Sequence, residues 1–251
     1  MRYFIELSYN GKNYFGWQRQ PNAISIQEMI EKALRVLLKK EISVMGCGRT
    51  DTGVHAEQFF AHFDADTEFD KNDLLYRINS FLPEDIVVYG FYEVSNEAHA
   101  RFDAVIRSYE YRIFLGKDPF LLDTVLQLHH QKLDVSLMNQ AAAELLNYTD
   151  FKCFSKSKTD VRTYNCDVKE AYWERKGPLL IFHISADRFL RNMVRAIVGT
   201  LLNVGMGKTG PEEFKKIIES KERSNAGASV KAKGLFLTKV VYPFEIIKGI
   251  D

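Results

Sequence analysis

The sequence predicts an α+β fold made of two halves that share a mostly antiparallel central sheet. Strand-like runs alternate with amphipathic helical segments along the whole chain, and the alternation recurs less tidily in the second half. The 251 residues suffice for one large domain or two intertwined smaller ones. No Pro/Ser-rich or low-complexity stretch separates the halves, which we place at residues 1–104 and 105–251.

The first half begins with a strand and continues through a loop rich in glycine, amide and aromatic side chains. Ser25 is then expected to cap a helix, with Glu28 three residues later completing a capping box. Apolar side chains recur at helical spacing as far as Leu38. In chain order the predicted elements are strand 3–9, loop 10–20, helix 26–38, strands 42–45 and 59–63, helix 70–80 and strand 86–91.

The second half is expected to carry the longest of its helices at 189–204, where apolar residues from Phe189 to Val204 share one face. The other elements predicted for this half are strands 105–115, 125–130, 167–174, 178–186 and 235–241, and helices 134–146 and 211–220.

Composition narrows the function classes. No apolar run approaches the ~20 residues that span a bilayer, and the first residues lack a signal-peptide pattern. The three cysteines, Cys47, Cys153 and Cys166, are widely spaced and indicate a reducing cytoplasm. Neither the cysteines nor the six histidines form a metal-ligand motif. The net charge of +1 neither demands nor excludes a polyanionic partner, although arginines cluster locally.

Asp51 is the leading candidate for a reacting group. It lies in the segment 48–56, a tight turn between two apolar runs, with glycines at both ends that allow unusual backbone angles or close approaches. A loop held by strands is the usual place for such a group. The neighbouring Arg49, Thr50 and Thr52 are able to hold the carboxylate ionised or to engage a ligand.

The sequence of this turn also fits two other interpretations. Asp-Thr-Gly also occurs in aspartic proteases, which pair two such carboxylates around one proton. This chain has one Asp-Thr-Gly, so proteolysis would require a symmetric dimer, and Arg49 would oppose proton sharing. A structural Asx-turn without chemistry is the more serious alternative.

Two further segments combine aromatic and basic residues. The loop 98–103 contains Arg101, and the strand 107–113 begins with Arg107. Tyr109 and Tyr111 point to the same face of that strand because side chains alternate along it. Such a pair usually serves packing, but aromatic rings interleaved with arginines also grip unstacked bases.

Arg195 lies in an otherwise apolar helical stretch, where a buried charge needs a partner. Either its side chain extends to water, or it forms a salt bridge with a carboxylate, for which Asp51 is the natural candidate. A charge-assisted hydrogen bond of this kind is worth ~1.5–3 kcal/mol and would keep an aspartate anionic.

These segments resemble the TruA-type tRNA pseudouridine synthases, and the resemblance runs in order through nearly the whole chain. It is carried by segments 9–11, 16–20, 25–28, 48–56, 79–86, 99–104, 107–111, 189–190, 193–195 and 234–237. It implies the pseudouridine synthase fold, with two ferredoxin-like or RRM-like halves. It also implies a cytoplasmic homodimer that isomerises uridine to pseudouridine at positions 38–40 of tRNA, in the anticodon stem-loop, without metal or organic cofactor.

The resemblance also assigns roles to residues. Asp51 matches the catalytic aspartate, and Tyr109 matches the tyrosine that stacks on the target base. Arg195 matches the basic residue that pairs with the aspartate, and Arg49 matches the arginine that fills the space of the flipped nucleotide. The set of residues expected to contact substrate or RNA is Arg49, Thr50, His55, Arg101, Arg107, Tyr111 and Arg191.

Some positions depart from the family pattern. Arg191-Asn192 stands where aromatic or histidine residues are common, and the segment 226–232 lacks prolines often found there. Asp51, Tyr109 and Arg195 are intact, so activity is expected. The competing interpretation is an RNA-binding module that keeps the surface but has little catalysis.

Overall fold

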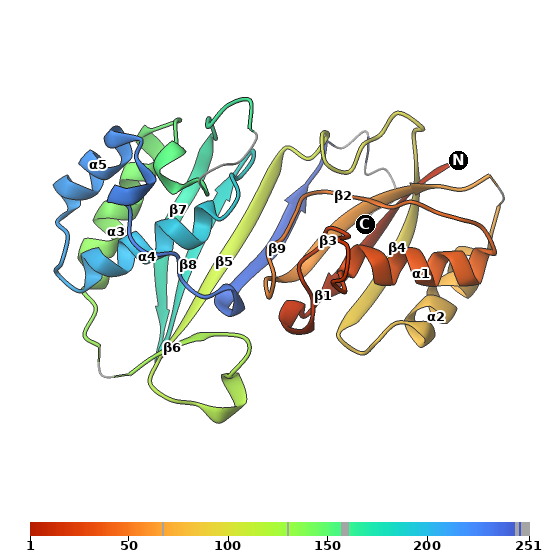
Figure 1. Ribbon diagram of the computed structural model, residues 1–251, viewed down its shortest axis with the longest axis horizontal. Coiled ribbons are helices and arrows are strands. Elements are labelled where there is room, and N and C mark those ends of the chain that lie inside the picture. Colours follow the sequence, from red (N-terminus) through yellow and green to blue (C-terminus); the bar gives the residue numbers. More distant parts are fainter. Residues whose placement is uncertain (67, 130, 157–160, 244–245, 247–251) are drawn as a thin grey trace. The chain divides into compact units, whose positions relative to one another are not determined.

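The computed structural model describes residues 1–66, 68–129, 131–156, 161–243 and 246, and within these ranges the chain forms two compact units. The first unit comprises Met1–Arg107 together with the last strand from Phe236, and the second comprises Ser108–Leu235. Figure 1 shows helices and strands in both. The division at 104/105 expected for the domains stays a prediction.

The first unit is built on four strands in the order β4-β1-β3-β9. The strands are β1 (Arg2–Tyr9), β3 (His55–Asp64), β4 (Ile86–Val94) and β9 (Leu235–Val241), with the two-residue β2 (Met45–Gly46) beside β3. The β1–β3, β1–β4 and β2–β3 pairs are antiparallel, whereas β3 and β9 are parallel.

Helices α1 (Ile26–Leu38) and α2 (Lys71–Phe81) pack on one face of these strands (Figure 1). Alternate residues of β1, such as Ile5 and Leu7, are fully buried, as are Ile30 and Leu34 of α1. Both helices begin as the sequence predicts. Ser25 accepts a hydrogen bond from the Glu28 backbone N–H at 3.3 Å, and Asp70 caps α2 in the same way.

The second unit has strands in the order β5-β8-β7, with β6 beside β5. Its strands are β5 (Ile106–Leu115), β6 (Leu126–Leu128), β7 (Val168–Lys176) and β8 (Leu179–Ala186). Its helices are α3 (Val135–Ala143), α4 (Met193–Gly205) and α5 (Pro211–Ser220), with 3-10 turns at Pro119–Leu121, Glu144–Asn147, Lys152–Phe154, Arg223–Asn225 and Ala232–Gly234. β7 and β8 are antiparallel, and β5 and β6 are parallel.

The predicted α+β class with mostly antiparallel strands is confirmed, and two element boundaries are corrected. The strand expected at 42–45 is reduced to β2, because α1 side chains satisfy the Val44 backbone: its N–H donates to Glu31 and its carbonyl accepts from Gln27. The helix expected from 189 begins at Met193, because Asn192 has a left-handed φ of 67° that a helix cannot continue through. Residue 130, the end of the expected strand 125–130, lies outside the described residues.

No helix in the described ranges is long and apolar enough to cross a membrane.

Candidate active site

Asp51 is half-buried in the loop between β2 and β3. The chain reverses direction there, helped by Gly53 at a φ of 75°, where a side chain would be strained. The Val54 N–H donates to the Asp51 carbonyl at 3.1 Å and closes the turn. Asp51 therefore lies in a tight turn whose last residue leads directly into β3.

A second loop, residues 10–17, lies directly against this turn. The Trp17 N–H donates to the Thr50 carbonyl and the Gly53 N–H donates to the Tyr14 carbonyl, both at 3.3 Å. The two backbones are so close that a Cβ at residue 16 would lie 2.2 Å from the Thr50 oxygen. The backbone is thus anchored immediately before Asp51 and two residues after it.

Thr50 and His55 are both buried and belong to this anchoring. The Thr50 hydroxyl shares a hydrogen bond with the Tyr9 hydroxyl at 2.9 Å. The His55 Nδ1 accepts from the Gly11 N–H at 3.1 Å, so a neutral ring carries its proton on Nε2. The His55 ring stacks on Phe236 at 4.5 Å. Although the sequence suggested RNA contacts for both residues, these hydrogen bonds and this ring contact are with the protein.

Arg49 is exposed beside Asp51, whereas Arg107 is occupied by the protein. The Arg107 guanidinium donates to the carbonyls of Cys47 (2.9 Å from Nη2), Ala104 (3.1 Å) and Arg101 (2.6 Å). Arg107 thereby ties the loop that carries Arg101 to the segment that leads into the Asp51 turn.

Phe102 is a residue whose role the sequence left unassigned. Its ring is 73% exposed, lies 4.3 Å from the His99 ring, and has the Arg101 guanidinium 5.6 Å from its centre. The His99 Nδ1 accepts from the N–H groups of Arg101 and Phe102, which fixes the loop. Exposure is the signal that separates Phe102 from core phenylalanines, and sequence alone does not supply it.

The two tyrosines of β5 differ in their surroundings. Tyr109 is half-buried and its ring meets Phe189 edge-on, with centroids 5.0 Å apart. Tyr111 is fully buried, and its hydroxyl donates to the Lys231 carbonyl at 2.7 Å. Burial raises the pKa of Tyr111 well above its usual value. A ring enclosed in this way serves packing, so we leave Tyr111 out of the RNA surface.

Arg195 is half-buried in the first turn of α4, where the segment 226–230 runs alongside. Its Nε donates to the Val230 carbonyl at 2.8 Å, and the Val230 N–H donates to the Arg195 carbonyl at 3.2 Å. Two departures from the family pattern meet here, because the Asn192 amide donates to the Ser229 hydroxyl at 2.6 Å. The neighbouring Arg191 is exposed.

The structure therefore brings together part of the predicted site within each unit. The first unit holds the Asp51 turn with Arg49, Thr50 and His55, and Arg107 links it to Arg101. The second unit holds Tyr109, Tyr111, Arg191 and Arg195.

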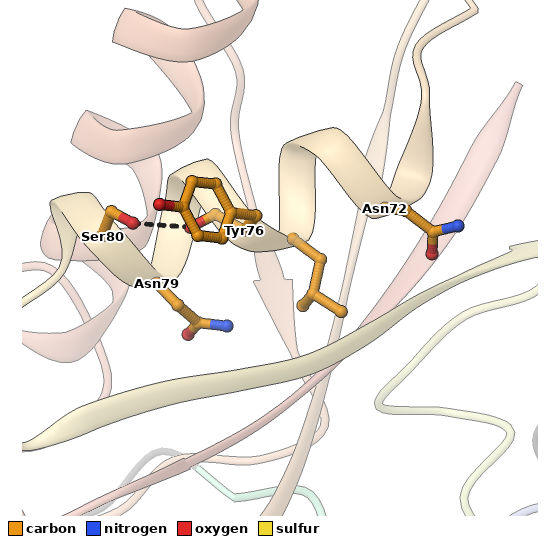
Figure 2. Close-up of a pocket in the computed structure, with 5 residues that line it drawn as sticks. Asn72, Tyr76, Asn79 and Ser80 are labelled. Atoms are coloured by element: carbon orange, nitrogen blue, oxygen red, sulfur yellow. Dashed lines mark hydrogen bonds between the residues drawn. The ribbon is translucent and has the colours of Figure 1, made fainter.

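A hollow of about 480 Å³ lies elsewhere, along the exposed side of α2. Figure 2 shows its lining, which is Asn72, Leu75, Tyr76, Asn79 and Ser80. Asn79 is committed to the protein, because its amide exchanges two hydrogen bonds of 2.8 Å with the Val88 backbone. None of the predicted site residues lines this hollow.

Among the described residues, no group of three or more histidine, cysteine, aspartate or glutamate side chains is arranged to hold a metal ion.

Sequence comparison with known proteins shows the family to which this chain belongs. A sequence model described as tRNA pseudouridine synthase matches residues 141–243. The chain is 49% identical over 253 residues to tRNA pseudouridine synthase A of Parabacteroides distasonis, covering 100% of this chain and 99% of the relative. Identity is also 49% to the protein of that name from Porphyromonas gingivalis, covering 98% of both chains. It is 41% to that of Clostridium acetobutylicum, covering 95% of this chain and 98% of the relative.

The fold and the matched region define a pseudouridine synthase, a class of isomerase. Within that class the chain belongs to the tRNA pseudouridine synthase family, since the similarity extends over its full length.

Proposed function

We propose that this chain isomerises uridine to pseudouridine at positions 38–40 of tRNA, in the anticodon stem-loop, with Asp51 as the catalytic carboxylate. The observation that carries the assignment of Asp51 is its turn, whose backbone is hydrogen-bonded to residues 10–17 on both sides of the aspartate. A carboxylate held in place by backbone contacts is suited to act repeatedly on one atom of a bound substrate.

The reaction needs a group that manages positive charge at the sugar. The bond between uracil N1 and the anomeric carbon breaks, the base turns, and C5 bonds to the same carbon. The proton on C5 leaves, and N1 ends with a hydrogen. A carboxylate stabilises or captures the charge that develops at an anomeric carbon, as in glycosidases. Asp51 would act by attack on that carbon or through a glycal intermediate.

Tyr109 and Arg195 are proposed to assist Asp51. The Tyr109 ring would stack on the flipped base and retain it while it turns, and its hydroxyl would help to remove the C5 proton. Arg195 is proposed as the cation that keeps Asp51 ionised, because an arginine in an apolar helix gains most from a carboxylate partner. Within its own unit, the Arg195 Nε donates to the Val230 carbonyl at 2.8 Å, which holds the side chain.

Exposed residues are the ones we propose for RNA contact. Arg49 would occupy the space left by the flipped nucleotide, Arg101 and Arg191 would meet phosphates, and Phe102 would stack on an unpaired base. Thr50, His55 and Arg107 would support the Asp51 turn instead, because their side chains are hydrogen-bonded to protein groups. We also propose, from the family resemblance, a homodimer that works in the cytoplasm.

Tritium release from tRNA labelled at uridine C5 tests the proposal. The unaltered chain should release tritium and Asp51→Ala should not, while still binding tRNA. Asp66→Ala is the matched control, because Asp66 is an exposed aspartate whose ion pair with Lys40 spans 3.7 Å. Release by Asp51→Ala at the normal rate would remove Asp51 from the mechanism. Binding without any release by the unaltered chain would favour the RNA-binding module.

A further inference from the structure

Asp85 anchors the loop that supports the Asp51 turn, although it lies 34 positions further along the chain. Its Oδ1 accepts from the Tyr14 hydroxyl at 2.5 Å and its Oδ2 accepts from the Asn13 amide at 3.1 Å. Its carbonyl accepts from the Asn10 N–H at 2.9 Å. Residues 10, 13 and 14 of the loop therefore all form hydrogen bonds to one residue, Asp85, which lies between α2 and β4.

The Tyr14 side chain is suited to be a lasting donor. It is 5% exposed, and burial, followed by the hydrogen bond to Asp85, raises the pKa of Tyr14 well above its usual value. The phenol thus keeps its proton at neutral pH. A hydrogen bond to a charged acceptor is roughly twice as strong as one between neutral groups.

The anchored loop touches the Asp51 turn at both ends. The Tyr14 carbonyl accepts from the Gly53 N–H, and the Gly11 N–H donates to His55. A Cβ at residue 11 would lie 2.0 Å from the Val54 oxygen, so the two backbones are in direct contact. Any shift of residues 10–14 is therefore transmitted to the residues that follow Asp51.

We propose that Tyr14 and Asp85 are positioning residues for Asp51, acting through the backbone of the loop 10–14. The inference rests on the proposed role of Asp51 and assigns a task to the segment 82–86, which that role leaves unexplained. Neither residue is required to touch the substrate. Their contribution is to hold the aspartate against its target atom, and misplacement by about 1 Å is enough to cost ~100-fold in rate.

The test separates rate from binding. Tyr14→Phe removes only the hydroxyl, and we expect kcat in tritium release to fall by about 10- to 100-fold while KM and the Kd for tRNA stay unchanged. Tyr92→Phe is the matched control in the same unit, because the Tyr92 hydroxyl donates to Glu6 at 2.9 Å and the pair lies outside the loop 10–17. Both variants lose one phenol–carboxylate bond, but only Tyr14→Phe should lose kcat.

An exchange of partners provides a second measurement. Asn13→Asp alone places two carboxylates together and should lower kcat, whereas Asn13→Asp with Asp85→Asn restores one donor and one acceptor and should recover it. Recovery supports the proposal even if Tyr14→Phe does not fold. The proposal is overturned if Tyr14→Phe has normal kcat, or if the exchange variant remains as slow as Asn13→Asp. Failure of the proposed function looks different, because the unaltered chain would then release no tritium.

Discussion

The carbonyl oxygen of Val54 occupies the space that a side chain on Gly11 would need, with the ideal Cβ position only 2.0 Å away. The backbones of Gly11 and Val54 both carry other contacts, so the two cannot move apart easily. Gly11→Ala should therefore lower the stability of the first unit by about 1–3 kcal/mol, the usual cost of overpacking. Denaturant unfolding followed by tryptophan fluorescence measures this loss, since Trp17 is the last residue of the same loop.

Gly48→Ala is the control for that experiment. Gly48 begins the segment 48–56 that contains the Asp51 turn. No heavy atom beyond its chain neighbours lies within 4 Å of its ideal Cβ position, and its φ is not in the left-handed region. An alanine there should change stability by less than about 1 kcal/mol, in the stabilising direction if it restricts the unfolded chain. Equal destabilisation by both substitutions would contradict a specific close approach at Gly11.

The element pattern was predictable where periodicity and caps agree, and was missed where side chains replace backbone partners. α1 begins where Ser25 and Glu28 predict, because the capping chemistry is local. The apolar run 42–45 looks like a strand, but Val44 is hydrogen-bonded by two side chains of α1. The start of α4 was missed for a related reason, since a left-handed Asn192 held by Ser229 is a tertiary feature.

The candidate site shows the same division. Asp51 was predictable because turn chemistry is written in neighbouring residues. The difference between Tyr109 and Tyr111 was not, since both occupy the same face of one strand and only the second is enclosed. Nor does sequence reveal that Arg107 binds three carbonyls while Phe102 stands exposed, because both facts depend on how loops return to the sheet.

Tyr109→Phe should abolish most turnover without affecting folding. The edge-on contact with Phe189 at 5.0 Å involves the ring, which phenylalanine keeps. The hydroxyl is the group proposed to assist removal of the C5 proton, and proton-transfer catalysis is worth roughly 100- to 10,000-fold. Single-turnover tritium release gives the rate and the melting temperature reports the fold. Unchanged release would reduce Tyr109 to a stacking surface.

Replacing Arg101 or Phe102 with alanine should weaken RNA binding, and the salt dependence of Kd should distinguish the two variants. Arg101→Ala would remove the proposed phosphate contact, so the slope of log Kd against log salt should fall by about 0.7–0.9. Phe102→Ala would remove the proposed stacking, worth roughly 1–3 kcal/mol, so affinity should drop at every salt concentration with the slope unchanged. Titration of a labelled anticodon stem-loop at several salt concentrations measures both. A Phe102→Ala protein that binds as tightly as the unaltered chain would remove Phe102 from the RNA surface.

His62 should make the first unit less stable in mild acid. Burial, assisted by the nearby Arg2 and His99, lowers the pKa of His62 from 6.5 to about 4, and its Nδ1 accepts from the Ala100 N–H at 3.1 Å. The unfolded chain therefore binds a proton between pH 6.5 and 4 that the folded chain does not. Stability from this group is complete above pH 6.5 and is lost as the pH falls, by up to about 1.4 kcal/mol per pH unit.

His62→Asn isolates that contribution, because an asparagine oxygen is able to accept from Ala100 in place of Nδ1 and does not titrate. Denaturant unfolding at pH 7, 6, 5 and 4 should give a shallower loss of stability in the variant than in the unaltered chain. His99 does not explain such a difference, since burial also lowers the pKa of His99 and both proteins contain it. If the free energy of unfolding falls with pH equally in both proteins, His62 takes up its proton as readily in the folded unit as in the unfolded chain. That result would contradict a pKa lowered by burial and by the acceptor role of His62 toward Ala100.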